Sequence, residues 1–348
     1  MNDDRLAASG RPIRSGPSLG RHGVCRRHHL LLFVFPPLAS CSGAQSALDP
    51  AGPEAAGVAT LFYTMLIGGI VIWCGVVGLL FYAARKRRAH STKSAGQLVL
   101  WGGAVFPTVV LAALLTYAVW LMPVMRPWFQ DDASGMRRIE VTGEQFWWRV
   151  RYLGEDSGPV FETANEVRIP VGERVVFLLK SPDVIHSFWI PVLGGKMDMI
   201  PGRENRLTLV AEKPGTYRGV CAEFCGPSHA LMAFTVHAME PRAYEAWLSA
   251  RKNSSGADAE GLALFLRHGC AACHAISGTE ARGTIGPDLT AFGERGSVGA
   301  GSLANTAEHI ARFIRYPDGV KPEVRMPHFS MLPDADVERI AAYLKGLR

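Results

Sequence analysis

The twelve residues "CAEFCGPSHALM" (221–232) contain two cysteines, one histidine and one methionine, and they decide how the chain is interpreted. Cys221, Cys225 and His229 recur every four residues, a spacing that would align them on one face of a helix. Pro227 argues against a helix, because a proline inside a helix removes a backbone donor and clashes with the preceding turn. We therefore predict a loop that joins the apolar segments "YRGV" and "AFTV".

The residue types in this loop favour one kind of site over two others. A disulfide between Cys221 and Cys225 would leave His229 and Met232 without a role. A zinc site with two cysteines and two histidines would need His186 as its fourth ligand. Zinc does not use thioethers, whereas thiolate, imidazole and a weak thioether together are typical of an electron-transfer copper site. A second thiolate would allow two copper ions to be bridged.

The region around the loop, residues 136–250, consists of short runs in which apolar and polar residues alternate. Ile139 and Val141 belong to one such run, and Leu207 and Leu209 belong to another. Stretches rich in glycine and proline, such as "EDSGP" and "EKPGT", separate the runs. Many short strands at this spacing predict an all-β domain, an antiparallel sandwich or barrel.

Two stretches upstream, 58–84 and 98–125, contain no charged residue. Each is longer than the roughly 20 apolar residues that cross a bilayer, and the chain as a whole is 48% hydrophobic with a mean hydropathy of +0.10. The loop between them, "RKRRAHSTKSAGQ", is basic and has no acid, and such loops stay cytoplasmic. We predict a two-helix transmembrane hairpin over 58–125, with everything after Arg126 on the outer side. The net charge of +6 is too modest to indicate nucleic-acid binding.

The N-terminal residues 1–41 have the pattern of a targeting segment. Arg26 and Arg27 precede the apolar run "LLLFVF", which is followed by "LASC". A basic region, an apolar region and small residues at a cleavage site define a secretory signal peptide. "LASC" also resembles a bacterial lipoprotein signal, in which Cys41 would carry lipid, so residues 1–41 are interpreted as a leader of either type.

A second extramembrane domain is predicted for residues 258–348, after a small and polar linker over 251–257. Cys270, Cys273 and His274 form the C-x-x-C-H signature of c-type haem attachment, in which the cysteines add to the haem and the histidine binds its iron. The alternative, a thioredoxin-like C-x-x-C, would require a βαβ setting that the sequence does not show. A helical stripe of apolar residues marks the C-terminus, and it consists of Val337, Ile340, Ala341 and Leu344, with Asp334 as the expected N-cap.

These motifs together resemble subunit II of the haem–copper cytochrome c oxidases, over roughly residues 58–250. The family loop C-x-E-x-C-x-x-x-H-x-x-M matches 221–232, its remote histidine motif matches "DVIHSFWIP", and L-G-x-K-x-D-x-x-P-G-R matches "LGGKMDMIPGR". The resemblance implies a membrane-anchored multidomain protein. It would consist of a transmembrane hairpin, then an all-β cupredoxin-like Greek-key barrel over 136–250, then an all-α cytochrome c domain.

The resemblance also implies a binuclear copper (CuA) centre and its ligands. Cys221 and Cys225 would bridge both ions, His186 and His229 would each bind one, and Met232 and the backbone carbonyl of Glu223 would be weak ligands. The Glu223 carboxylate would help bind magnesium at the interface with subunit I, with Asp198 near the same interface. The alternative for Asp198 and Lys196 is a surface ion pair in a turn.

The C-terminal part resembles class I cytochrome c. "GPDL" (286–289) matches the segment near the proximal histidine, and "MPHF" matches the loop that carries the sixth ligand. This resemblance implies haem c held by Cys270, Cys273, His274 and Met326, with Met331 as the competing methionine. A histidine–methionine pair raises the haem potential, as an electron donor to an oxidase requires.

The resulting hypothesis is the subunit through which electrons enter a proton-pumping, caa-type cytochrome c oxidase of the bacterial inner membrane. Expected partners are oxidase subunit I, subunit III, the membrane, and a donor such as a soluble cytochrome c or a respiratory complex, without nucleic acid. Oxygen would be reduced on subunit I. Two alternatives stay open, namely a subunit of a CuA-containing nitric oxide reductase and a copper chaperone of oxidase assembly.

Overall fold

The computed structural model describes residues 42–85, 92–125, 135–154, 156, 158–251 and 258–348. The predicted leader, 1–41, lies outside the described residues, as does the predicted linker apart from Arg251.

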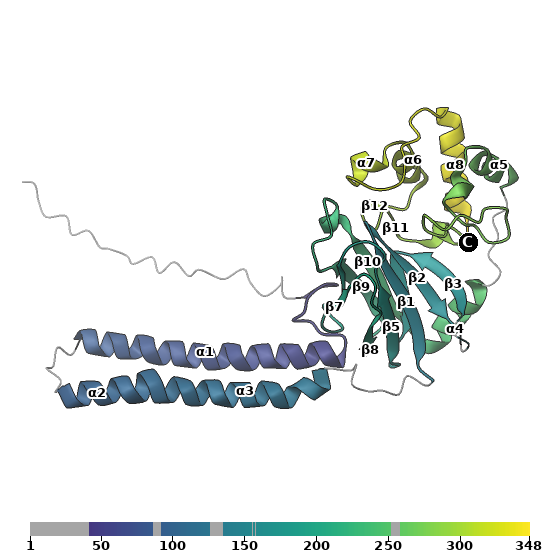
Figure 1. Ribbon diagram of the computed structural model, residues 1–348. Helices are drawn as coiled ribbons and strands as arrows, with labels where there is room; N and C mark the ends of the chain where they lie inside the picture. The colour runs from purple at the N-terminus through teal and green to yellow at the C-terminus, as the bar shows by residue number, and fades with distance from the viewer. Residues whose placement is uncertain (1–41, 86–91, 126–134, 155, 157, 252–257) are drawn as a thin grey trace, which may run out of the picture. The chain divides into compact units, whose positions relative to one another are not determined.

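The first described elements form a helical hairpin. Helix α1 (Pro53–Arg85) packs against α3 (Phe106–Met125), which continues from α2 (Thr92–Leu100) through the π-helical turn η2 (Trp101–Val105) (Figure 1). Both helical arms are long and apolar enough to cross a membrane, and they include both predicted spans. Four threonines each donate a hydroxyl hydrogen bond of 2.8 Å to the carbonyl four residues earlier, namely Thr60, Thr64, Thr108 and Thr116. Each of these hydroxyl groups therefore has its hydrogen-bond partner within its own helix, and an apolar surrounding could not provide one.

The start of α1 is attached to the β-domain by backbone contacts. The Ala51 N–H donates to the Val192 carbonyl at 2.8 Å, and the Ala55 N–H donates to the Leu193 carbonyl at 3.3 Å. Between them, a Cβ on Gly52 would lie 2.5 Å from the Val210 carbonyl oxygen. Only glycine allows the backbones to approach so closely, so the helix begins at a fixed point of the barrel.

Ten strands form two five-stranded sheets that enclose the core of the β-domain (Figure 1). One sheet has the order β3-β2-β1-β5-β8 and the other β4-β10-β9-β6-β7. The strands are β1 (Arg137–Glu144), β2 (Trp147–Leu153), β3 (Pro159–Ala164), β4 (Glu166–Pro170), β5 (Val175–Lys180), β6 (His186–Trp189), β7 (Met197–Met199), β8 (Asn205–Leu209), β9 (Gly215–Cys221) and β10 (Ala233–Met239). Strand pairs β1–β5 and β4–β10 are parallel, so the sheets are mixed where an antiparallel arrangement was expected. The partners in each parallel pair are not consecutive, because the chain crosses to the other sheet between them.

Aromatic side chains fill the space between the sheets. Trp148, Phe188 and Phe234 are buried, and their ring centroids lie 5.7 Å (Trp148–Phe188), 5.1 Å (Trp148–Phe234) and 4.6 Å (Phe188–Phe234) apart. A Cβ on Gly219 would lie 2.1 Å from the Phe234 ring, so the absence of a side chain at 219 makes room for this stack. The cluster sits directly behind His186, whose ring centroid is 6.2 Å from that of Trp148. The same packing that stabilises the barrel therefore also supports a candidate ligand.

The C-terminal part is mainly helical. After helix α4 (Pro241–Ala250), which begins with proline at its first position, the elements are α5 (Ala259–Arg267), the 3₁₀ turns η6 (Cys270–Ala272) and η7 (Phe292–Glu294), short strands β11 (Ser297–Val298) and β12 (Leu303–Ala304), and helices α6 (Ala307–Arg315), α7 (Pro317–Val320) and α8 (Asp334–Gly346). Helix α8 packs against α5 and α6 (Figure 1). All four residues of the predicted C-terminal stripe are buried. The helix begins at Asp334 itself, one residue earlier than expected, with Pro333 in the capping position.

Candidate metal and haem sites

The loop 221–232 brings its sulfur and nitrogen atoms together at the end of two neighbouring strands. It leaves β9 at Cys221 and returns through the 3₁₀ turn η4 (His229–Leu231) to β10. Cys225 Sγ lies 3.8 Å from Cys221 Sγ, 3.6 Å from His229 Nδ1 and 3.8 Å from Met232 Sδ. Cys221 Sγ lies 3.2 Å from the carbonyl oxygen of Glu223.

His186 joins this group from the first residue of β6. Its Nε2–H donates to Asp183 Oδ1 at 2.9 Å, and its Nδ1 faces the thiols, 3.8 Å from Cys221 Sγ. A Cβ on Gly143 would lie 3.0 Å from the imidazole, so β1 also fixes the position of the ring. Burial opposes ionisation of Asp183, but hydrogen bonds from His186 and from the backbone N–H of Gln145 and Val184 prevail and lower the pKa of Asp183 to about 2. Asp183 is therefore ionised and fixes the tautomer of His186.

The two thiols have very different proton affinities. A hydrogen bond from Cys225 is the largest cause that lowers the pKa of Cys221, with His186 and backbone N–H groups adding to it, and the pKa of Cys221 falls to about 3. The neighbouring Cys221 sulfur and burial raise the pKa of Cys225. Two thiolates 3.8 Å apart repel each other, so this pair needs a positive charge between its sulfurs in order to ionise fully.

The donor set fits a metal better than the alternatives. The ligand atoms of His186, Cys221 and Cys225 all lie within 4.8 Å of one another, and all three residues are buried. A sulfur separation of 3.8 Å excludes a disulfide, whose bond is about 2.05 Å. Two sulfurs at this distance can both bond one ion at a metal–thiolate distance of about 2.3 Å. Two thiolates, two imidazoles and a thioether are a copper-type set.

Glu223 also presents a carboxylate on the surface of this site. Lys196 Nζ lies 2.7 Å from Asp198 Oδ1 and 3.3 Å from Glu223 Oε2, and all three side chains are exposed. The hydrogen bond from Lys196, with one from Ser187, lowers the pKa of Asp198. In this chain alone, Lys196 and Asp198 form the surface ion pair that was one of the two interpretations of these residues.

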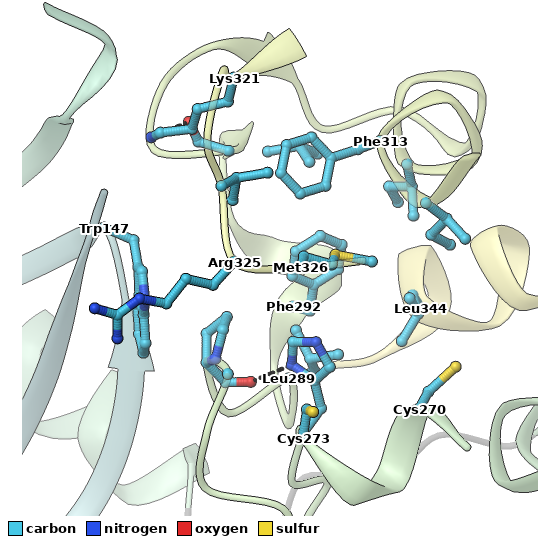
Figure 2. Close-up of a pocket in the computed structure, with 18 of the residues that line it drawn as sticks. Trp147, Cys270, Cys273, Leu289, Phe292, Phe313, Lys321, Arg325, Met326 and Leu344 are labelled. Atoms are coloured by element: carbon cyan, nitrogen blue, oxygen red, sulfur yellow. Dashed lines mark hydrogen bonds between the residues drawn. The ribbon is translucent and has the colours of Figure 1, made fainter. Parts of the chain in front are cut away.

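The four residues expected to hold haem line one cavity of the C-terminal domain, which is otherwise mostly apolar. Figure 2 shows Met326 reaching into this cavity between Phe313 and Leu289, with Cys270 and Cys273 at the other end. Met331, the competing methionine, is 68% exposed and does not line the cavity. The geometry therefore favours Met326.

The imidazole of His274 is oriented for ligation. Its Nδ1–H donates to the Pro287 carbonyl at 2.8 Å, and burial lowers the pKa of His274, so the lone pair of a neutral ring is on Nε2. A Cβ on Gly286 would lie only 2.6 Å from His274 Cε1, so the glycine of "GPDL" lies against the ring. Burial also raises the pKa of the Cys270 thiol to about 11. An apolar cavity with two thiols, a neutral imidazole and a thioether fits a c-type haem.

Several residues were not assigned to the haem cavity from the sequence. Gln145, Phe146 and Trp147 of the β-domain contribute to the lining of the haem cavity, and so does Lys321. None of them belongs to a ligand motif, and their role follows only from how the chain folds. Asp183 was not predicted either, because its position three residues before His186 gives no signal by itself.

The chain is similar to known proteins over both of these domains. Residues 144–239 match the family described as cytochrome c oxidase subunit II, periplasmic domain, and residues 259–348 match cytochrome c. The cytochrome c oxidase subunit 2 of Alkalihalophilus pseudofirmus is 36% identical over 89% of this chain and 94% of its own length. The chain belongs to the cytochrome c oxidase subunit 2 family. The subunit 2 of Bacillus subtilis is 31% identical over 92% of this chain and 97% of its own length.

A solved structure is similar to part of the chain. The periplasmic domain of subunit II of cytochrome oxidase from Bradyrhizobium japonicum is 32% identical, with a TM-score of 0.31, over 33% of this chain and 93% of that one. As a subunit 2, this protein is part of a haem–copper oxidase. Its subunit II domain implies CuA copper and its cytochrome c domain implies haem, while its apolar helices indicate a membrane anchor with a periplasmic domain. Its expected partner is subunit I of the same complex.

Proposed function

We propose that this subunit 2 relays electrons from a c-type haem to a binuclear copper centre and then to haem in subunit I, where oxygen is reduced to water. The haem would be held by Cys270, Cys273, His274 and Met326. The copper ligands would be His186, Cys221, Cys225, His229, Met232 and the Glu223 carbonyl. The observation that carries the proposal is the convergence of buried His186, Cys221 and Cys225 donor atoms within 4.8 Å, in the same chain as a haem cavity.

The role of the polypeptide is to keep the copper ligands in a rigid arrangement. Bound copper would supply a pair of ions that share one electron through the two sulfurs. Ligand atoms from strand ends of one sheet, β6, β9 and β10, cannot move independently, because the strands are hydrogen-bonded to one another. The Asp183 bond to His186 and the aromatic stack behind it restrict the imidazole further. Because the ligand set is rigid, each electron transfer is accompanied by only a small structural change at the site.

The finer assignments follow the same proposal. Residues 1–41 would be a leader, 58–125 a hairpin that crosses the bacterial inner membrane twice, 136–250 the copper domain, 251–257 a linker and 258–348 the haem domain. In the assembled oxidase the carboxylate of Glu223 would help bind magnesium at the surface facing subunit I. Subunit III would complete the complex, and a soluble cytochrome c or a respiratory complex would donate electrons.

Metal analysis and absorption spectra of the purified, membrane-extracted protein test the proposal. We expect copper, a near-infrared mixed-valence band and a c-type haem spectrum. Cys221→Ser should abolish the copper band and leave the haem attached, whereas Cys74→Ser, which changes an exposed thiol in α1, should alter neither. Iron without copper, after expression in a copper-replete host with its maturation factors, would refute the copper assignment. Co-purification with an oxygen-reducing subunit, rather than a nitric oxide-reducing one, would decide the type of complex.

A further inference from the structure

Lys321 is a buried lysine between the two candidate redox sites. Its side chain is 2% exposed, although lysine is rarely buried without a charge partner. Its Nζ donates to the Leu231 carbonyl at 2.9 Å and to the Gly299 carbonyl at 3.0 Å. Within the described part of the chain no carboxylate pairs with it. Leu231 directly precedes Met232 of the copper loop, and Gly299 lines the haem cavity, so one ammonium group joins the two sites.

Two further hydrogen bonds link the same segments. Ser228, which is fully buried, donates its hydroxyl to the Pro322 carbonyl at 2.6 Å. The Ala233 N–H donates to the Ala300 carbonyl at 3.3 Å. Adjacent residues of the haem domain, Lys321 and Pro322, thus contact the last residue of the 3₁₀ turn and the residue before its first. The copper loop and the haem domain each supply a donor to these contacts.

The same segment reaches the copper site a second time. Arg325 Nη2 lies 3.4 Å from Asp183 Oδ2, and the other oxygen of Asp183 accepts the hydrogen bond from His186. Arg325 is next to Met326, which lies in the haem cavity (Figure 2). Residues 321–326 therefore carry contacts to the copper loop, to the residue that orients His186, and to the haem cavity itself.

We propose that residues 321–326 form a docking latch that holds the haem cavity against the copper loop, with Lys321 as its main positioning residue. The purpose of the latch rests on the proposed function, because it would keep the two redox centres at a fixed separation. The contacts themselves involve only groups of this chain. The partner of the latch is the loop 228–233 of the same molecule.

The chemistry of Lys321 suits this role. Burial lowers the pKa of Lys321 to about 7, and even the neutral amine keeps two N–H donors for its two carbonyl partners. Undocking would leave the Leu231 carbonyl without its bond until water reached it, whereas the bond to Gly299 lies within the haem domain and would remain, so the bond to Leu231 is the one that favours the docked state. A hydrocarbon side chain of similar length could fill the space but could not bind the carbonyls.

Hydrogen exchange of the full-length protein tests the latch without requiring copper. The Ala233 amide reports undocking, because its hydrogen bond crosses between the two segments. We expect Lys321→Met to raise its exchange rate about tenfold, the effect of losing a strong hydrogen bond. Lys345→Met is the matched control, since Lys345 Nζ donates to the Gly293 carbonyl at 2.8 Å inside the haem domain. An unchanged rate in Lys321→Met, or an equal rise in Lys345→Met, overturns the proposal.

Ser228→Ala provides a second variant on the opposite side of the contact. It removes one hydroxyl from the copper loop and leaves every residue of the haem domain in place, so it does not depend on whether Lys321→Met folds. We expect about a threefold rise in exchange at Ala233, since a neutral hydrogen bond is weaker than one to an ammonium group. No rise in this variant would also contradict the latch.

The rate of electron transfer from haem to copper shows whether residues 321–326 position the two sites or only stabilise the fold. In the copper-loaded oxidase, transfer from reduced haem to copper should not depend on solvent viscosity, because the domains are already docked. In the double variant Lys321→Met/Ser228→Ala it should slow as viscosity rises, because docking must then precede transfer. Viscosity dependence in the unaltered protein would refute the latch. Absence of a copper signal would instead refute the proposed function, while the exchange experiment would still judge the latch.

Discussion

Replacing Gly286 with alanine would test whether the orientation of His274 is built into the haem domain. A Cβ at position 286 would lie 2.6 Å from His274 Cε1, 2.9 Å from Nδ1 and 3.1 Å from Nε2. The backbone at 286 is not in the left-handed region, so alanine adds no conformational strain of its own. The only change is therefore a methyl group in too close contact with the His274 imidazole.

The distances give the size of the effect. Ordinary contacts begin at 3.4 Å, so the ring or the backbone must move by 3.4 − 2.6 = 0.8 Å at Cε1. Adding a methyl group to a packed interior costs about 1–3 kcal/mol. A movement of that size along the 2.8 Å hydrogen bond from Nδ1 to the Pro287 carbonyl would break it, at a cost of about 1 kcal/mol. We expect a total of about 2–4 kcal/mol against the present ring position.

The assay is the spectrum and reduction potential of the haem in the full-length protein. In Gly286→Ala the haem should remain covalently attached, because Cys270 and Cys273 are unchanged, but high-spin species should appear and the potential should fall as the histidine–iron bond weakens. Gly319→Ala is the control, since the nearest atom to its Cβ would be Tyr316 Cβ at an ordinary 3.8 Å. A low-spin spectrum with unchanged potential in Gly286→Ala would show that Gly286 does not position His274.

Three other substitutions address the β-domain, and each is checked by denaturant unfolding of the solubilised chain. Gly219→Ala should destabilise it by about 3 kcal/mol, because the new Cβ would lie 2.1 Å from the buried Phe234 ring; a loss below about 1 kcal/mol would contradict the packing. Arg149→Met should cost about 1–3 kcal/mol, because the partly buried carboxylate of Glu144 loses its guanidinium and Glu162 keeps only Arg151, and a neutral result would contradict this. Although burial opposes its ionisation, Lys180 and a neighbouring arginine lower the pKa of Glu140 below 4.5. Glu140→Gln should therefore cost about 1 kcal/mol above pH 4.5, a difference that disappears as pH falls through the lowered pKa; a loss that persists in acid would rule out this charge effect.

The copper site shows which part of a site a sequence can predict. The loop 221–232 contains most of its donors within one short segment, so their types and spacing alone suggested a copper ligand set. His186 was considered for a zinc site, but it could be assigned as a copper ligand only through a resemblance, because it lies 35 positions before Cys221. The hydrogen bonds between β6 and β9 bring these two residues together, and alternation of apolar residues predicts strands without predicting which strands pair.

In the haem domain, the sequence predicted the ligands but not the residues that surround them. C-x-x-C-H identified Cys270, Cys273 and His274 at once, since covalent attachment requires that spacing. The match of "MPHF" already favoured Met326 over Met331, and the cavity supports that choice, because Met326 lines it whereas Met331 is exposed. Lys321 gave no signal, because a single lysine in a polar loop is ordinarily exposed, and only the fold shows that its ammonium is enclosed by carbonyl groups.

The two contacts of the latch have a consequence for how the sites depend on each other. Lys321 binds the carbonyl immediately before Met232, and Arg325 lies beside the carboxylate that orients His186. Each contact is thus one residue or one hydrogen bond away from a proposed copper ligand. We therefore expect docking of the haem domain and orientation of the copper ligands to be coupled, and any such coupling acts equally in both directions. A substitution confined to residues 321–326 should for this reason alter the copper centre as well as the rate at which electrons reach it.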